Sequence, residues 1–178
     1  MRRTAAAFSV ILLALTSGCA TRPYQGELLA SAEHPYAVGS GDRLRIIVFG
    51  QDSLSNSYSV DASGQISMPL IGLVPVNGMT TQQIQHAIEA RLRTGFLREP
   101  RVSCEVEAYR PFFILGEVTN AGQYPYVNGM TVQTAVAIAG GYTPRAAQSS
   151  ARMTRVQHVG QIIGDVDMSY AVQPGDTI

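Results

Sequence analysis

The sequence predicts an α+β protein built from two small modules, each a mixed β-sheet packed on one helix. The first observation behind this prediction is an unchanged repeat: the pentapeptide VNGMT occurs at residues 76–80 and again at 127–131. A helical apolar period follows each copy, and short strands with glycine turns precede each copy. A chain of 178 residues is long enough for an N-terminal leader and two modules of this size.

The N-terminus has the pattern of a secretory signal. Arg2 and Arg3 precede the apolar run Ala5–Leu15, which is too short to span a bilayer. The run leads through small residues into Cys19. We therefore expect residues 1–18 to form a signal peptide that is removed from the mature chain.

A cysteine at the end of the signal resembles the signal of bacterial lipoproteins, in which Cys19 would become the acylated first residue. Ala20 follows the cysteine in place of Asp, which favours sorting to the outer membrane. Ordinary secretion with a coincidental cysteine is the alternative. Residues 19–35 carry no sustained period and are expected to form a flexible tether.

The first module is expected to open with Val38–Phe49, a glycine-rich turn that leads into a β-branched strand. Tyr58–Asp61 and Gln65–Pro69 predict a hairpin, and Leu73–Val76 predicts another short strand. Arg101–Ala108 alternates between apolar and polar residues and is expected to close the module as a strand.

A helix is predicted between these strands. Thr80 with Gln83 three residues later is a capping-box pattern at its start, and Gly95 ends it. Its apolar stripe consists of Ile84, Ala87, Ile88 and Leu92.

The second module repeats this order. Phe112–Leu115 predicts a strand, Asn120–Gly122 a turn, and Val132–Ala139 a helix that stops at the glycine pair 140–141. Val60–Gln65 and Val118–Gln123 have a similar pattern at the preceding turns. Two modules of the ubiquitin-like β-grasp type are therefore predicted, and they arose by duplication or by convergent turn chemistry.

The C-terminal part is expected to form a hairpin from Ala151–Val159 and Gln161–Asp167, turned at Gly160. Val172–Ile178 then resembles Val38–Leu44, which introduces a strand. We expect either a very short edge strand at this end or a sequence that is cut short.

Charge and cysteine content narrow the function. The 13 basic and 13 acidic residues balance, every basic residue is arginine, and no basic stripe indicates nucleic-acid binding. A GC-rich genome is the favoured explanation for arginine in place of lysine. The alternative is that arginine was selected for bidentate contacts with acidic sugars. If Cys19 is acylated, Cys104 has no disulfide partner, and its place in the alternating strand predicts a small buried side chain.

Nothing in the sequence predicts catalysis. His34, His86 and His158 are isolated, and none has metal-ligand spacing with cysteine or carboxylates. No nucleophile, base and orienting group occur together in a recognisable pattern. We therefore predict a protein that is not an enzyme and that needs no metal or cofactor.

Several segments together are specific to a known family. Those of residues 36–108 resemble the polysaccharide export domain of Wza-like outer-membrane lipoproteins. Those of residues 109–178 resemble the soluble ligand-binding β-grasp (SLBB) domain that follows it. The segments are Tyr36–Ile46, Val60–Ile66, Met68–Gly72 and Arg101–Val106 in the first domain, and Gly116–Tyr124 and Ala139–Arg145 in the second.

This resemblance implies a lipid-anchored, largely periplasmic protein that assembles as a homo-oligomeric ring. The ring would conduct capsular or exopolysaccharide to the outer membrane, with an inner-membrane polysaccharide copolymerase as partner. Larger relatives carry further SLBB modules and a C-terminal amphipathic helix that lines the pore. This sequence has one SLBB-like module, so we expect a periplasmic conduit that hands polymer to another outer-membrane component. The alternative is a lipid-anchored glycan-binding or structural module that does not conduct polymer.

Aromatic residues gather in residues 109–128, YRPFFILGEVTNAGQYPYVN. Tyr109 and Arg110 fall at the junction of the modules, while Tyr124 and Tyr126 are expected on one strand face. Packing in the core or between subunits is favoured over sugar stacking, because burial of aromatic area stabilises either setting. The candidate residues for glycan or subunit contact are Tyr109, Arg110, Tyr124, Tyr126 and Arg145.

Overall fold

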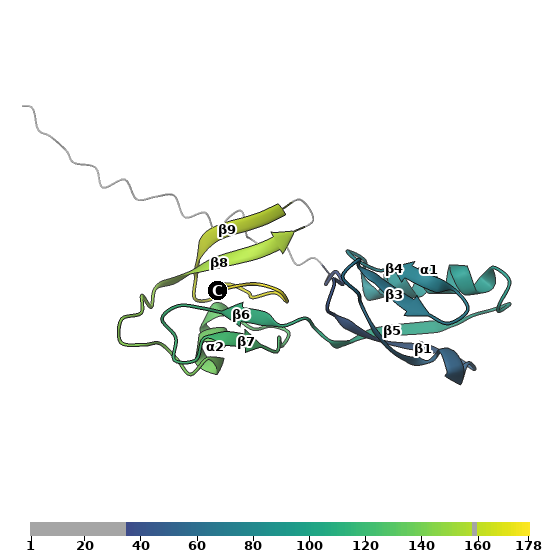
Figure 1. Cartoon of the computed structure of the whole chain (residues 1–178), viewed down its shortest axis with the longest axis horizontal. Coiled ribbons are helices and arrows are strands. Elements are labelled where there is room, and N and C mark those ends of the chain that lie inside the picture. Colours follow the sequence, from purple (N-terminus) through teal and green to yellow (C-terminus); the bar gives the residue numbers. More distant parts are fainter. Residues whose placement is uncertain (1–34, 158–159) are drawn as a thin grey trace, which may run out of the picture.

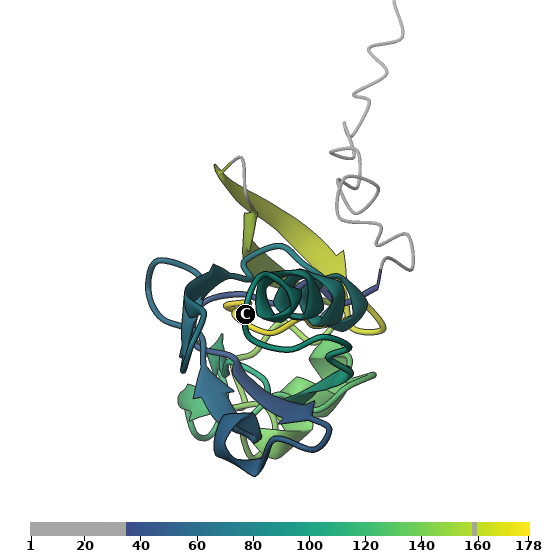
Figure 2. The same ribbon diagram turned by 90° about the vertical axis from the view of Figure 1, so that its right-hand side faces the viewer.

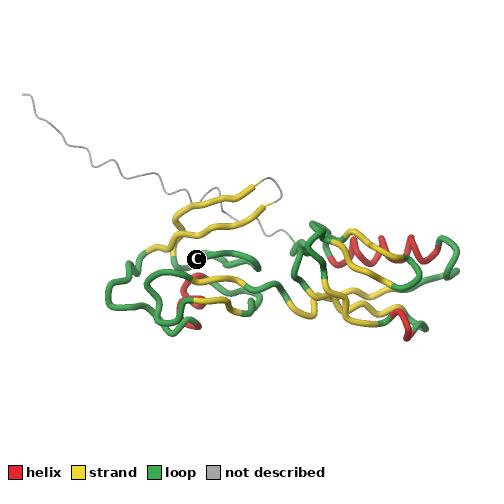
Figure 3. The backbone as a smooth tube through the Cα atoms, viewed as in Figure 1, coloured by secondary structure: helices red, strands yellow, loops and turns green. Residues whose placement is uncertain are grey.

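The computed structural model describes residues 35–157 and 160–178. The expected signal peptide, Cys19 and nearly all of the expected tether lie outside these ranges. Two bodies lie side by side along the long axis, joined by the segment between β5 and β6 (Figure 1). Each body combines strands with one α-helix, which confirms the predicted α+β class and its two modules (Figure 3).

The first module is centred on β1 (Arg43–Val48), which is antiparallel to both β2 (Asn56–Ser59) and β5 (Val102–Ala108). A separate antiparallel pair consists of β3 (Gln65–Met68) and β4 (Gly72–Pro75). Side chains alternate along β1, so Leu44, Ile46 and Val48 enter the core while Ile47 and the two arginines face outward.

The predicted hairpin of Tyr58–Asp61 with Gln65–Pro69 is wrong, because β2 pairs with β1 and β3 pairs with β4. A short 3-10 helix, η2 (Asp52–Leu54), turns the chain back after β1. The Ser55 hydroxyl fixes this turn by accepting a hydrogen bond from the Val48 N–H at 3.0 Å. The loop before β2 thereby directs β2 onto β1.

Helix α1 (Thr81–Arg93) begins with the predicted capping box. Thr80 accepts from the backbone of Gln83, and the Gln83 side chain accepts from the backbone of Thr80. Ile84, Ile88 and Leu92 are buried, whereas Ala87 at the edge of the stripe is only partly buried.

The second module contains β6 (Phe112–Ile114), β7 (Gly122–Tyr124), α2 (Val132–Ile138) and the hairpin of β8 (Ser150–Gln157) with β9 (Gly160–Asp167). The hairpin rises away from the rest of the module in both views (Figure 1 and Figure 2). The expected turn at Gly160 is wrong, since Gly160 opens β9 and pairs with Gln157.

The C-terminal residues lie between strands of the second module. Thr177 pairs in parallel with Phe113 and antiparallel with Thr154, so the C-terminal segment joins β6 to β8. Ile178 donates its N–H to Phe113 at 2.9 Å and accepts from Leu115 at 2.8 Å. The expectation of an edge strand is therefore wrong, because this segment has a neighbour on each side.

Each module has its own hydrophobic core. The first core surrounds Leu44, Ile46 and Ile66, and the second surrounds Phe112, Val132 and Met153. Cys104 belongs to the first core, where burial raises the pKa of its thiol to about 11. It is a buried small side chain, as predicted.

Candidate functional site

Two loops of similar sequence meet at the seam between the modules. The first loop is Tyr36-Ala-Val-Gly-Ser-Gly-Asp42, and the second loop is Tyr170-Ala-Val-Gln-Pro-Gly-Asp176. The similarity noted from Val172 onward thus extends back to the tyrosine. Each loop packs its valine beneath one copy of the VNGMT turn: Val38 donates to the Met79 carbonyl at 2.9 Å, and Val172 donates to the Met130 carbonyl at 3.0 Å.

Asp42 is the anchor of the first loop and is fully buried. It accepts hydrogen bonds from the backbone of Gly39 and of Arg110, both at 2.8 Å, and from the Tyr36 hydroxyl. The Arg110 guanidinium completes the site, with Nη1 3.1 Å from the carboxylate. Burial and the bond to Asp42 raise the pKa of Tyr36 well above its usual value, so its hydroxyl remains a neutral donor.

Asp176 anchors the second loop in the same way but with a different arginine. Arg155 of β8 donates to both carboxylate oxygens, at 2.9 and 2.7 Å, and both side chains are almost completely buried. The backbone of Gln173 adds a bond at 2.7 Å. Both arginines lie over the tyrosine of their loop, Arg110 over Tyr36 and Arg155 over Tyr170.

Arg110 lies between the two loops. A Cβ added to Gly39 would be 2.5 Å from Nη1 of Arg110, and one added to Gly175 would be 2.9 Å from its Nε. The Gly175 N–H also donates to the Pro111 carbonyl at 3.0 Å. Glycine at these two positions therefore permits the close approach of both loops to one side chain.

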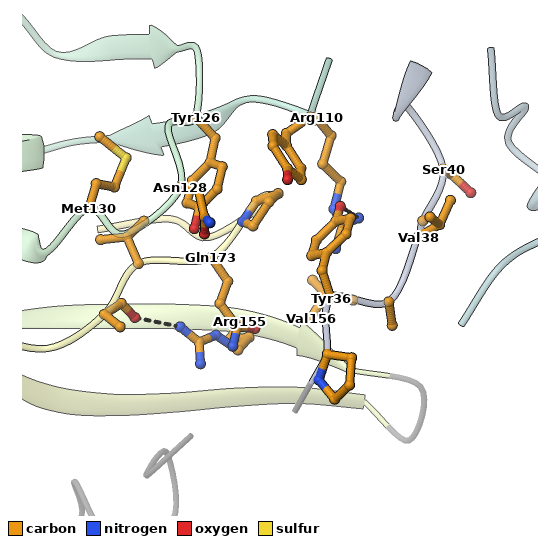
Figure 4. Close-up of a pocket in the computed structure, with 18 of the residues that line it drawn as sticks. Tyr36, Val38, Ser40, Arg110, Tyr126, Asn128, Met130, Arg155, Val156 and Gln173 are labelled. Carbon is orange, nitrogen blue, oxygen red and sulfur yellow. Dashed lines mark hydrogen bonds between the residues drawn. The ribbon is translucent and has the colours of Figure 1, made fainter. Parts of the chain in front are cut away.

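An open cleft of about 1220 Å³ follows this seam. Figure 4 shows Tyr36 of the first module between Tyr126 and Asn128 of the second module and Val38 and Ser40, which also line the cleft. The ring of Tyr109 meets those of Tyr36 and Tyr126 edge to face, with centroids 4.9 and 5.3 Å apart. An aromatic ladder thus crosses from one module to the other.

The candidate residues from the sequence divide into two groups. Tyr109, Arg110 and Tyr126 line the cleft. Tyr124 instead packs beside Phe112 and donates its hydroxyl to the Asn120 carbonyl at 2.5 Å, while Arg145 is exposed and forms an ion pair with Glu117 at 3.0 Å. Neither Tyr124 nor Arg145 lines the cleft.

The sequence analysis missed several residues of this site. The repeated tyrosine of the two loops would have indicated Tyr36, and the two copies of VNGMT supply Asn77 and Asn128 to the cleft. No sequence pattern indicated Arg155, because its pairing with Asp176 depends on how β8 packs against the second loop.

Within residues 35–157 and 160–178, no three histidine, cysteine, aspartate or glutamate side chains are grouped in a way that could hold a metal ion. In the same part of the chain, no helix is both long enough and apolar enough to cross a membrane.

Comparison with known proteins gives two domain matches in the order seen here. Residues 30–107 match the polysaccharide biosynthesis/export protein family, and residues 111–169 match the SLBB domain. The two matched ranges correspond to the two modules and leave the Tyr109–Arg110 junction between them.

Similar proteins have names that refer to polysaccharide. The exopolysaccharide production protein ExoF of Rhizobium meliloti is 34% identical over 142 residues, covering 73% of this chain and 33% of ExoF. The EPS I polysaccharide export outer membrane protein EpsA of Ralstonia nicotianae is 30% identical over 157 residues, covering 73% of this chain and 41% of EpsA. The polysialic acid transport protein KpsD of Escherichia coli is 23% identical over 111 residues, covering 61% of this chain and 20% of KpsD.

The chain thus spans less than half the length of these relatives. The two domain matches nevertheless cover both modules of this chain in order. The chain belongs to the Wza-like polysaccharide export protein family, with one export domain followed by one SLBB domain.

Proposed function

We propose that this protein is a subunit of a lipid-anchored conduit that carries capsular or exopolysaccharide across the periplasm to the outer membrane. The observation that carries the proposal is the export domain followed by an SLBB domain. The names of ExoF, EpsA and KpsD, which refer to exopolysaccharide production, polysaccharide export and polysialic acid transport, support it.

The proposed mechanism is passive guidance. Copies of the chain form a homo-oligomeric ring whose modules line a hydrated lumen, and an inner-membrane copolymerase delivers the polymer. Weak, repeated contacts suit a conduit, because tight binding at one place would stall the chain. The proposal gives this protein no catalytic step and no metal or cofactor.

Cys19 is the proposed anchor. Acylation there would hold the chain at the outer membrane and leave both modules in the periplasm. EpsA, a relative with 30% identity, is named as an outer-membrane protein. Labelling with a radioactive fatty acid should mark the wild-type chain, whereas Cys19→Ser should remove the label and release the protein from outer-membrane fractions.

Deletion of the gene tests the conduit. Surface polysaccharide should fall and polymer should accumulate in the periplasm, as measured by glycan staining of intact and osmotically opened cells. Re-expression of the wild-type chain should restore export. Unchanged surface polysaccharide in the deletion strain would contradict the proposal.

A module that binds glycan without conducting it is the second candidate, and the seam cleft with its aromatic ladder favours it. Native mass spectrometry of the acylated chain separates the two. A homogeneous ring supports the conduit, whereas a monomer with measurable glycan affinity supports the binding module.

A further inference from the structure

The seam cleft has the composition of a saccharide site rather than of a simple packing defect. Its volume of about 1220 Å³ exceeds the 300–1,000 Å³ of common small-molecule pockets, and the cleft is open to solvent. An open groove of this size suits a segment of a polymer better than a single small metabolite.

The aromatic wall supplies the apolar part of such a site. Tyr36, Tyr109 and Tyr126 are each partly exposed, and the edge-to-face contacts between them hold the rings in place. The C–H bonds on one face of a pyranose carry partial positive charge and meet the negative face of an aromatic ring favourably. Burial raises the pKa of Tyr126, so its hydroxyl remains a neutral hydrogen-bonding group, whereas the Tyr36 hydroxyl is already bonded to Asp42 and Arg110.

Amide side chains supply the polar part. Asn77 and Asn128, the asparagines of the two VNGMT turns, line the cleft together with Gln173. The side chains of Asn77 and Asn128 are exposed and have no hydrogen-bond partner among the described residues. An amide both donates and accepts, so it matches a sugar hydroxyl, which does the same.

The charges of the cleft cancel. Arg110 and Arg155 both line it, but each forms an ion pair with a buried aspartate, Asp42 or Asp176. No aspartate or glutamate is among the described residues that line the cleft. A site whose cations are already neutralised offers little net attraction to a polyanion.

We infer that the seam cleft binds a segment of uncharged pyranose residues, stacked on Tyr109 and Tyr126 and hydrogen-bonded to Asn77 and Asn128. This inference deepens the proposed function, because it assigns the contact between polymer and conduit to the junction of the two domains. The two rings lie nearly perpendicular, at 78°, so neighbouring sugars of the segment stack on different rings while their hydroxyls meet the two asparagines, one from each module. The site is complete only when both modules are in place.

The test is binding of defined oligosaccharides to the full mature chain in detergent. Maltohexaose, cellohexaose and laminarihexaose serve as neutral probes, and hexagalacturonate serves as the acidic probe, in calorimetry and saturation-transfer NMR. At least one neutral probe should bind with a Kd of about 1 mM, as expected for a few stacking and amide contacts. Hexagalacturonate should bind more weakly.

Matched variants locate the site. Tyr126→Leu should weaken binding about threefold to tenfold, whereas Tyr142→Leu, a partly buried tyrosine outside the cleft, should not. Because Tyr126 also packs on the second core, the double variant Asn77→Ala/Asn128→Ala provides a second measurement that spares the core. It should weaken binding by a similar factor, while Asn56→Ala on β2 leaves binding unchanged.

Several results would overturn the inference. These are no binding of any neutral probe, preferential binding of hexagalacturonate, or affinity unchanged by the cleft variants. A change of oligomeric state in those variants without a change in affinity would assign the cleft to contact between copies and also overturn it. Export lost on gene deletion together with no oligosaccharide binding would reject this site but leave the proposed function intact. Oligosaccharide binding together with normal export in the deletion strain would support this site but reject the proposed function.

Discussion

The two loops at the seam share a sequence pattern but hold their arginines in different surroundings. Asp42 of the first loop pairs with Arg110, whose side chain is 28% exposed and comes from the junction between the modules. Asp176 of the second loop pairs with Arg155, whose side chain is 6% exposed and comes from β8 of the same module. The same motif therefore serves two purposes: the first loop ties the modules together, and the second holds one module together.

The two aspartates also differ in how many hydrogen-bond donors other than the arginine side chain they have. Without its arginine side chain, Asp42 would keep the backbone bonds from Gly39 and Arg110 and the hydroxyl of Tyr36. Asp176 would keep only the Gln173 N–H among its described partners. A buried carboxylate with three remaining donors costs less to leave unpaired than one with a single donor. The two ion pairs should therefore differ in what their loss costs.

Arg155→Met should have the largest effect. Removal of the guanidinium leaves Asp176 buried and nearly unpaired, which typically costs about 3–5 kcal/mol. Urea unfolding, followed by hydrogen exchange of amides in β8, measures the loss. Arg152→Met is the matched control, because Arg152 lies on the same strand in an exposed pair with Asp165 and should change stability by less than about 0.5 kcal/mol. Equal effects of the two substitutions would show that the buried pair contributes no more than a surface pair.

Arg110→Met should cost less, about 2–3 kcal/mol, since Asp42 keeps three donors. This variant is distinguished by which amides lose protection from hydrogen exchange. Amides of both loops, at Gly39 and Gly175, should exchange faster, because Arg110 contacts both of them. A loss confined to the first module would contradict the role of Arg110 in joining the modules.

The order of helices and strands could be predicted from the sequence because it is encoded by short motifs of neighbouring residues. The VNGMT repeat and the Thr80–Gln83 pair placed α1 and α2 correctly, and glycines marked their ends. Strand pairing could not be predicted in the same way. Whether β2 meets β1 or β3 depends on the Ser55 hydroxyl and the turn of η2, and the contact of Thr177 with both Phe113 and Thr154 spans most of the second module.

Every candidate residue that lines the cleft comes from the aromatic block of residues 109–128. Tyr109 and Arg110 were among the candidates because the sequence pattern located the boundary between the two modules. Arg155 joins Asp176 across 21 residues and Asn77 reaches the cleft from the other module, and no local pattern reports such contacts. The tyrosine shared by the two loops was a missed signal, because the loops lie far apart in the chain.

Glycine substitutions separate the crowding of Arg110 from backbone strain. Gly175 has a φ of 87°, so Gly175→Ala should cost about 2 kcal/mol, from the left-handed backbone and from contact with Arg110. Gly39 has no such φ, and Gly39→Ala should cost about 1 kcal/mol from crowding alone. In an Arg110→Ala background the Gly39 cost should vanish, whereas about 1 kcal/mol should remain at Gly175. Unfolding free energies of the three single and two double variants measure this, and a Gly39 cost that persists without Arg110 would place the strain elsewhere.

The helix caps provide a comparison in which the modules should not differ. Thr80 accepts from the backbone of Gln83 and Thr131 from that of Thr134, both at 3.3 Å, although Thr replaces Gln at the third helical position of α2. Thr80→Ala and Thr131→Ala should therefore each cost about 1 kcal/mol. Thr→Ser at either position should restore most of the loss, since the hydroxyl returns. Hydrogen exchange of the first helical turn, read in each module separately, gives the two values. A clear inequality between them would show that the cost of losing a cap depends on the module around it and not on the shared hydroxyl bond alone.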